Sequence, residues 1–298
     1  MSQQITTAFV AQYRANVEML VQQRQSKFEG LVRRETQNGE YEYFEQIGPV
    51  SAAPWGPRHG DTPLMETPHE RRRNTTSPWV WADLIDKPDR VRTLIDPTSP
   101  YATNAVMAFN RRKDDIILRA ALGTAYTGYE GEVPVALPAA NIIDGTAGRL
   151  TLALLKEVKL GFWNDDVDDG EPIIMAVSPD QIDSLLDDEH LTSSDFNSVK
   201  ALVQGDINTF YGIHFVRTTR LPFVDTGDGT HDTTASAWCP SGILLATAEN
   251  IAVRMDERAD KKYSTQVFVS MDIGAMRMEE KKVRAIVTRD ETKPNHAP

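Results

Sequence analysis

Residues able to do chemistry are few in this chain of 298 residues, and their spacing matches no common catalytic or metal-binding motif. The six histidines share no metal-ligand spacing, and no His-Glu-x-x-His motif occurs. Cys239 is the only cysteine, which excludes an intrachain disulfide and a cysteine zinc cluster. It is more simply interpreted as a small buried residue than as a nucleophile. Gly123 and Gly128 have the spacing of a phosphate-binding loop, but Tyr129 stands where that loop requires lysine.

A cluster of carboxylates at residues 165–169 is the one segment that invites a test as a calcium loop. Placing Gly170 at the sixth position of an EF-hand puts Val167 at the third position and Ala176 at the twelfth, where a carboxylate is required. The segment therefore fails as an EF-hand and is interpreted as a solvated acidic turn. Nothing singles out a pair of groups for acid–base catalysis. The sequence thus predicts no cofactor, no metal site and no enzymatic activity.

The distribution of charged residues indicates association between copies of the chain more than binding of nucleic acid. The formal net charge of −11 argues against a general nucleic-acid binder, because phosphate contacts require clustered Lys and Arg. Basic groups do cluster locally, but most have acidic neighbours. Such clusters are either solvated faces or complementary charges between subunits, and DNA binding is the least favoured interpretation. The candidates for contacts between subunits are Arg33, Arg34, Tyr41, Tyr43, Phe44, Arg71, Arg72, Arg73, Asp114 and Asp115.

The N-terminal segment is predicted to form an amphipathic helix over residues 5–21, because its apolar residues recur in steps of three and four. Asn38-Gly39 stands between extended runs at residues 31–36 and 41–44 and predicts a β-hairpin, because both turn residues tolerate positive φ. Prolines at positions 49, 54, 57, 63 and 68 then predict an extended segment outside any central sheet. A loop of this length is uncommon inside a compact domain, so we expect it to reach another chain.

The rest of the chain mixes helices and strands. Ser99 as a cap, Pro100 in the first turn and Gly123 at the end predict a helix of about 34 Å over residues 100–122. A second helix is expected at 150–160, and Ser178 is expected to cap a third that starts at residue 179. Further expectations are a helix at 199–203, strands at 173–177, 213–216, 243–245, 251–253, 266–269 and 283–287, and a loose tail beyond residue 289.

Composition sets broader limits. No run approaches the roughly 18 apolar residues that a membrane span needs, and the N-terminus lacks the pattern of a secretory signal. We therefore expect a soluble intracellular protein with no membrane partner. With 40% hydrophobic residues, the chain has material for one large domain or two ordinary ones.

An ordered set of strings, from near residue 30 to near residue 287, resembles the major capsid proteins of tailed bacteriophages. Each string is weak alone, and the order gives the set its specificity. The strings include Asp61-Thr62-Pro63-Leu64-Met65, Trp81-Ala82-Asp83-Leu84-Ile85-Asp86, Asp96-Pro97-Thr98-Ser99-Pro100-Tyr101, Gly123-Thr124-Ala125-Tyr126-Thr127-Gly128, Phe210-Tyr211-Gly212, Arg220-Leu221-Pro222 and Arg277-Met278-Glu279-Glu280-Lys281-Lys282-Val283.

The resemblance implies the Hong Kong 97 capsid fold, an α+β architecture with five parts. These are an N-terminal arm at residues 1–28, an extended loop of hairpin and proline-rich return at 29–85, a peripheral domain with a spine helix at 86–148, an axial domain at 149–250, and peripheral return strands with the tail at 251–298. The implied function is structural: self-assembly into pentamers and hexamers of an icosahedral head shell that encloses the phage genome.

The resemblance also implies partners and a location. The chain itself is the first partner, followed by a portal protein, decoration proteins and double-stranded DNA that is enclosed without sequence-specific binding. Scaffolding is expected from a separate protein, because the capsid-like strings begin too early for a long scaffolding segment. The expected location is the virion, with assembly in the host cytoplasm.

Two other functions remain open at this level. One is a cellular nanocompartment shell of the same fold, which would hold cargo proteins. The other is an oligomeric α+β enzyme without a recognisable motif. Particle contents separate a nanocompartment from a phage shell, and particle size separates a shell from an enzyme.

Overall fold

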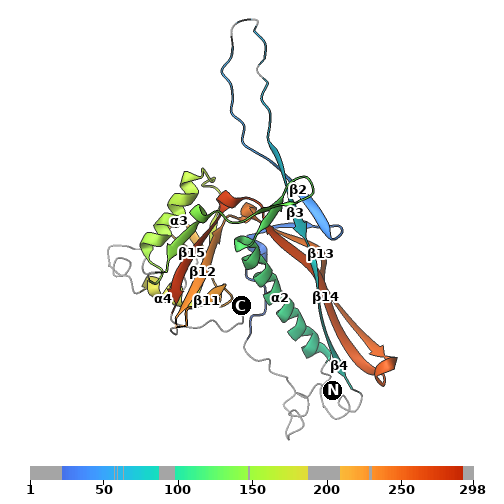
Figure 1. The fold of residues 1–298 in the computed structure, drawn as a ribbon. Helices are drawn as coiled ribbons and strands as arrows, with labels where there is room; N and C mark the ends of the chain where they lie inside the picture. The colour runs from blue at the N-terminus through green and yellow to red at the C-terminus, as the bar shows by residue number, and fades with distance from the viewer. Residues whose placement is uncertain are drawn as a thin grey trace.

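The computed structural model describes residues 22–56, 58, 60–62, 64–86, 98–146, 148–186, 209–227 and 230–290. Within them the chain forms three β-sheets and several helices, and a long hairpin projects far beyond the rest of the molecule (Figure 1). The helices expected at 5–21 and 199–203, and the tail beyond residue 290, lie outside the described residues.

The first sheet has the strand order β1-β13-β14-β4 and contains the longest strands. β13 (Ile243–Arg258) and β14 (Ser264–Arg277) form an antiparallel ribbon, to which β4 (Ser77–Ile85) adds antiparallel and β1 (Arg33–Thr36) parallel. The expected strands at 243–245 and 251–253 are both parts of β13, because irregular pairing between them does not end the strand.

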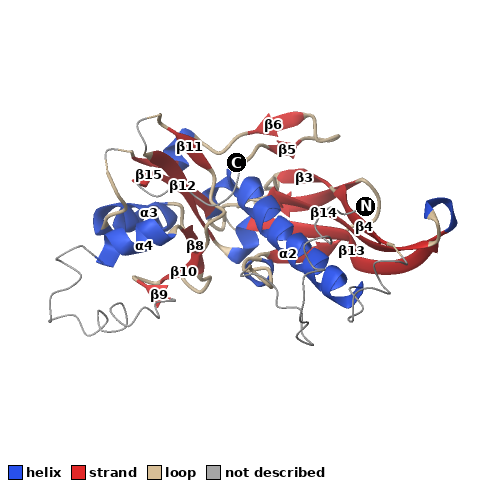
Figure 2. Cartoon of the chain, turned by 90° about the horizontal axis from the view of Figure 1, so that it is seen from below, coloured by secondary structure: helices blue, strands red, loops and turns tan. Residues whose placement is uncertain are grey.

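Helix α2 (Thr98–Leu122) lies along this sheet and confirms the long helix expected from the sequence (Figures 1 and 2). The expected Ser99 cap is wrong, because the helix begins at Thr98 and Ser99 lies within it. Phe109, in its first half, packs in a cluster with Ile273 of β14. Ile117 and Leu118, in its second half, belong to the main core instead. The helix therefore joins two cores.

The second sheet has the order β7-β15-β12-β8-β10-β9, with β11 paired to β12. Helices α3 (Leu152–Asn164) and α4 (Pro179–Leu186) lie on one side of it (Figure 2). Its strands are β7 (Ile142–Gly145), β8 (Ile173–Val177), β9 (Thr209–Phe210), β10 (Ile213–Arg217), β11 (Phe223–Asp225), β12 (His231–Trp238) and β15 (Val283–Asp290).

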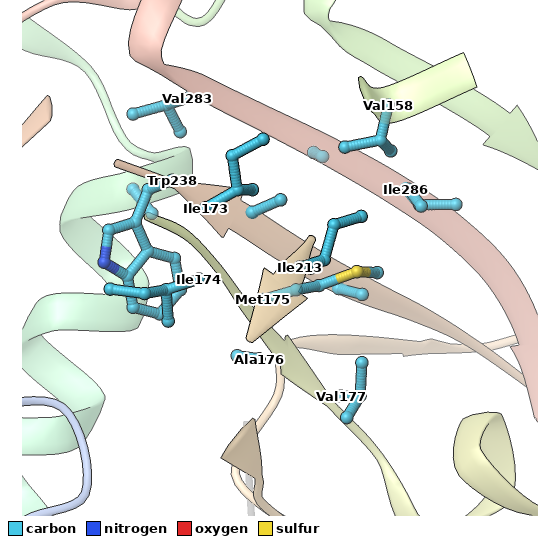
Figure 3. Close-up of a cluster of buried hydrophobic side chains, with 14 of the residues drawn as sticks. Val158, Ile173, Ile174, Met175, Ala176, Val177, Ile213, Trp238, Val283 and Ile286 are labelled. Atoms are coloured by element: carbon cyan, nitrogen blue, oxygen red, sulfur yellow. The ribbon is translucent and has the colours of Figure 1, made fainter. Parts of the chain in front are cut away.

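The main core is built around β8, in which all five residues are buried. This strand lies between β10 and β12 and is covered on both faces, which explains its continuous apolar run. Figure 3 shows Ile174 beside Trp238, with Val158 of α3 and Ile286 of β15 on the other side. Trp238 also packs edge-on against Phe28, with ring centroids 5.5 Å apart.

The expected Ser178 cap of α4 is confirmed. The amide of Gln181 donates to Ser178 Oγ at 3.1 Å, and the amide of Ser178 donates to Gln181 Oε1 at 2.8 Å. This reciprocal pair is a capping box, which satisfies two backbone donors at the start of the helix.

The third sheet joins β2 (Tyr41–Ile47), β3 (His69–Thr75), β5 (Ala125–Thr127) and β6 (Val133–Val135), in that order. β2 and β3 pair antiparallel along their full length and form the base of the projecting hairpin. The proline-rich segment is therefore the tip of this hairpin, and not a return that follows it.

The prediction of a β-hairpin at Asn38-Gly39 is wrong, because the strands on either side of the turn do not pair with each other. The turn itself is present. Gly39 has a φ of +92°, as the sequence predicts, but β1 pairs with β13 and β2 pairs with β3, so the turn links two different sheets. Buried Gln37 fixes this turn, because its side-chain amide donates to the carbonyls of Gly39 and Glu40, both at 3.0 Å. Local turn chemistry predicts the bend but not the partners of the flanking strands.

Two strands that lie outside residues 149–250 belong to the second sheet. β15 was expected among the peripheral return strands, but it pairs with β12 and β7 in the second sheet. β7 likewise falls within residues 86–148, expected to be peripheral, and also belongs to the second sheet. The second sheet is therefore built from segments that are separated in sequence by strands of the first sheet.

Candidate assembly surface

The outer face of the third sheet carries aromatic and basic side chains. Residues of a strand alternate between its two faces, so Tyr41 and Tyr43 of β2 share the outer face with Arg71 and Arg73 of β3. Both tyrosines are exposed and both arginines are half-buried. The structure thus brings four of the predicted contact residues together on one surface, which we call the Tyr–Arg face.

Two residues that sequence reasoning missed complete the Tyr–Arg face. Arg71 lies 5.6 Å from the ring centroid of Tyr43 and 5.3 Å from that of Tyr129. Arg73 lies 5.4 Å from the centroid of Tyr41 and 5.2 Å from that of Tyr126. Each guanidinium is therefore held between two tyrosine rings by cation–π attraction. Tyr126 lies on β5 and Tyr129 follows it, a pairing between distant segments that no local pattern reveals.

Backbone groups hold the two arginines in place. Arg71 donates to the carbonyl of Tyr129 at 3.4 Å and pairs with the Glu45 carboxylate at 3.1 Å. Arg73 donates to the carbonyl of Glu130 at 3.2 Å. The face is thus organised before any partner arrives.

The opposite face of β3 points into the molecule, and this corrects one predicted contact residue. Arg72 is only 4% exposed and pairs with Glu280 at 2.7 Å within the same chain. Phe44 of β2 likewise faces inward and packs against a cluster that includes Leu244 and Met276. Arg72 is therefore not free for another subunit, whereas Phe44 is partly buried and stays a predicted contact.

Glu280 is shared with Arg277, which is fully buried and caps the end of α2. Arg277 donates to the carbonyls of Ala121 at 3.1 Å, Gly123 at 2.6 Å and Val135 at 2.9 Å. Burial lowers the pKa of Arg277, and the Glu280 carboxylate opposes that shift. Within the string from Arg277 to Val283, Arg277 therefore connects the end of α2 to β6 of the third sheet.

Asp114 and Asp115, also predicted as contacts between subunits, are used within the chain. Asp114 is fully buried and accepts hydrogen bonds from the Ser26 hydroxyl at 2.6 Å and the amides of Lys27 at 3.1 Å and Phe28 at 3.3 Å. They fix residues 22–29 against α2.

Asp115 holds a second segment against the same helix. It forms a two-fold pair with Arg220, at 2.5 and 2.6 Å, and this hydrogen bonding raises the pKa of Arg220. Arg220 follows β10, so the pair ties α2 to the body built on the second sheet.

Arg33 and Arg34 stay on the surface. Arg33 pairs with Glu35 two residues away at 2.9 Å, and the two side chains of that pair are 49% and 40% exposed. Arg34 is exposed on β1. Nothing in the fold assigns either arginine to a partner, and both remain predicted contacts.

The tip of the projecting hairpin is the most exposed part of the described chain. Every described residue from 49 to 68 is exposed, and the large apolar side chains of Trp55 and Leu64 are 97% and 93% exposed. The hydrogen bond from the amide of Gly48 to the carbonyl of Pro68, at 2.9 Å, closes the base of this tip. Figure 1 shows the tip extending away from both bodies.

The described residues contain no group of three or more His, Cys, Asp or Glu side chains that could hold a metal ion. Cys239 is buried, and desolvation raises the pKa of its thiol to about 12, so it is an inert core residue as expected. None of the described helices is long and apolar enough to cross a membrane.

Comparisons with known proteins agree with this architecture. The capsid of Cyanophage P-SCSP1u aligns with a TM-score of 0.72 at 15% identity, covering 95% of this chain and 94% of that one. The capsid of Ralstonia phage GP4 gives 0.70 at 13% identity, with 97% of each chain covered. The capsid of Helicobacter pylori bacteriophage KHP30 gives 0.72 at 10% identity, with 97% and 98% covered. No curated sequence matches the chain.

The fold is that of the shell proteins of phage heads, which confirms the α+β, Hong Kong 97-like class expected from the sequence. The family model described as phage capsid protein matches residues 5–289, and the chain belongs to this family. It is a structural protein, a major capsid protein that forms the shell of the virion, and not an enzyme.

Proposed function

We propose that this chain assembles into pentamers and hexamers of an icosahedral head by laying the β2–β3 tip of each copy on a neighbouring copy. The observation that carries the proposal is the exposure of Trp55 and Leu64 on a hairpin that leaves its own fold. Soluble proteins rarely present such side chains on a projecting segment without a partner.

The energetics favour such a contact. Fully burying one large apolar side chain contributes roughly 2–3 kcal/mol, before the cost of ordering the interface. Donor and receiver are different surfaces of the same chain, so the contact is head-to-tail, and it forms a ring when the rotation between neighbouring copies closes. A ring repeats the contact at every subunit, which makes assembly cooperative although each contact is modest.

The test removes the tip and leaves its base. Residues 49–67 are replaced by a short Gly/Ser bridge between Gly48 and Pro68, whose backbones are already hydrogen-bonded at 2.9 Å. The variant should fold with an unchanged thermal midpoint but form no shells by electron microscopy and sedimentation. Ser51→Ala, within an intact tip, is the control and should assemble normally. Normal shells from the shortened chain would overturn the proposal.

The contents and partners of the shell belong to the same proposal. The shell encloses double-stranded DNA without gripping it, because a chain of net charge −11 offers little neutralisation of phosphate. Purified unassembled protein should therefore show no retention of duplex DNA at physiological salt, and a salt-sensitive gel shift would contradict this.

A portal protein, a separate scaffolding protein and decoration proteins complete the proposed partners, and assembly takes place in the host cytoplasm. DNA within isolated particles would separate this reading from a protein-filled nanocompartment.

A further inference from the structure

The Tyr–Arg face has the chemistry of a receptor for an extended peptide. Tyr41, Tyr126 and Tyr129 present exposed rings, and the arginines between them are already fixed. Beside Arg71 and Tyr129 lies an open pocket of about 520 Å³. Aromatic-lined surfaces of this kind bind proline-rich, extended segments, which lose little entropy on binding.

The charges of the face disfavour a nucleic acid as the occupant. Glu45 pairs with Arg71, and Glu130 and Glu132 lie at the turn beside Arg73. Hydrogen bonds from backbone amides lower the pKa of Glu132, so this carboxylate is ionised at neutral pH. A phosphate backbone would meet these carboxylates, whereas an uncharged peptide would not.

The chain itself contains a segment with the complementary chemistry. Residues 48–56 read Gly-Pro-Val-Ser-Ala-Ala-Pro-Trp-Gly, with two prolines, no charge and Trp55 fully presented to solvent. Within one copy this segment is carried away from the third sheet by its own hairpin (Figure 1). Nine extended residues span at most about 30 Å, so Trp55 lies well away from the base of its own hairpin.

We propose that the Tyr–Arg face of one copy receives residues 48–56 of a second copy, with Trp55 in the pocket beside Arg71 and Tyr129. The proposal rests on the proposed function and names the receiving surface for the tip. The indole ring can lie over the Arg71 guanidinium or against the Tyr129 ring, and the prolines can pack on the outer tyrosines. One hairpin then carries the donor at its tip and half of the receptor at its base.

The first test is a cross-link that leaves Trp55 and the tyrosines of the Tyr–Arg face unchanged. Ala53→Cys on the tip and Glu130→Cys beside the pocket are combined in the full chain, and assembled particles are treated with a short bismaleimide. We expect a ladder of covalent oligomers on a denaturing gel. The matched control combines Ala53→Cys with Val224→Cys, an exposed position on β11, and should give no ladder. Native Cys239 does not compete, because its thiol is buried with a pKa of about 12.

The outcomes separate this proposal from the proposed function. Particles that form normally but give no 53–130 ladder would overturn the receiving surface and leave the tip contact standing. If the tip-deleted chain still forms shells, the proposed function itself fails.

A second test measures coupling between donor and receptor. Trp55→Ala and Tyr129→Ala should each raise the protein concentration needed for assembly roughly tenfold, as central interface residues do. If the two side chains touch across the interface, the double variant should be little worse than either single variant. Trp55→Ala combined with Val224→Ala should behave as Trp55→Ala alone. Full additivity of Trp55→Ala and Tyr129→Ala would contradict the contact.

Discussion

The charged band in the middle of α2 and the Tyr–Arg face look alike in sequence, since each combines arginines with carboxylates nearby. In α2, Lys113 pairs with Glu29 at 2.9 Å, and Asp114 and Asp115 are both held by partners from the same chain. On the third sheet, the arginines instead stack on exposed tyrosines above an uncovered surface. The first region holds the subunit together, and the second remains available to a neighbour.

Local clustering of charged residues in the sequence therefore does not identify an interface between subunits. Arg71-Arg72-Arg73 shows both an internal and a surface role within three residues. Strand alternation directs Arg72 inward to Glu280 and directs Arg71 and Arg73 outward to the tyrosine rings. A better indicator is large apolar exposure on a projecting element, which Trp55 provides. Predictions that separate subunit stability from assembly test this distinction directly.

The largest expected effect comes from reversing the inward arginine. Arg72→Glu removes the partner of Glu280 and places a second carboxylate beside it in a buried site. Breaking a buried pair in this way costs about 3–5 kcal/mol, so the free subunit should unfold at markedly lower denaturant or fail to accumulate.

Arg71→Glu is the matched control, on the same strand but the opposite face. It should lower the free energy of unfolding by about 1 kcal/mol, well below the effect of Arg72→Glu, because partly exposed ion pairs and cation–π contacts each contribute little. It should nevertheless impair assembly. Equal destabilisation by the two substitutions would erase the distinction between the faces of β3.

A somewhat smaller effect is expected for Asp114→Ala in α2. The substitution leaves the Ser26 hydroxyl and the amides of Lys27 and Phe28 without their acceptor at a buried site. Hydrogen bonds to a charged group contribute roughly 1.5–3 kcal/mol, so the unassembled subunit should lose about that much in urea unfolding. Residues 22–29 should also become more susceptible to proteolysis. Glu45→Ala, at an exposed pair on the third sheet, should leave both measurements unchanged.

Trp55→Ala should weaken assembly while leaving the stability of the free subunit unchanged. The free energy of unfolding of the free subunit should change by less than about 0.5 kcal/mol, because the side chain touches solvent on nearly all of its surface. Assembly should weaken strongly, as measured by sedimentation of particles against protein concentration. A clear loss of subunit stability would mean that the tip folds back on its own chain.

Much of this comparison could be predicted from the sequence, and the rest could not, for a physical reason. The C-terminal end of α2, the Ser178 cap and the buried strand at 173–177 follow from local periodicity and capping chemistry. The start of α2 does not, because the helix begins at Thr98 and includes Ser99, which was expected to cap it. The choice of partner for β1 and β2, and the meeting of Arg277 with Glu280 at the end of α2, depend on segments far apart in the chain. Local patterns contain no information on such pairings.

The contact residues show the same division. Tyr41, Tyr43, Arg71 and Arg73 were predicted and do share one face. Tyr126 and Tyr129 were missed, because only the pairing of β5 with β3 brings them there. Whether these residues touch another subunit stays a prediction.

The smallest expected effect concerns a buried carboxylate that, unlike Asp114, weakens the fold when it is charged. Asp290 lies at the end of β15, and the Ser178 hydroxyl donates to it at 2.7 Å. Burial raises the pKa of Asp290, the neighbouring Asp180 raises it further, and the hydrogen bond from Ser178 only partly opposes this. A pKa above the unfolded value means that its favourable contribution is complete below the unfolded pKa and is lost as pH rises through the folded pKa.

Asp290→Asn keeps an acceptor oxygen for Ser178 and removes the charge. The variant should match the native chain in acid and be slightly more stable at neutral pH, as measured by urea unfolding of the free subunit across the acid range. Asp232→Asn, which removes a partly exposed partner of Arg289, should show no such gain at neutral pH. If Asp290→Asn instead destabilises the subunit at neutral pH, the ionised carboxylate is needed by its hydroxyl donor, Ser178. Asp290 would then belong with Asp114, as an interior charge that holds the subunit together.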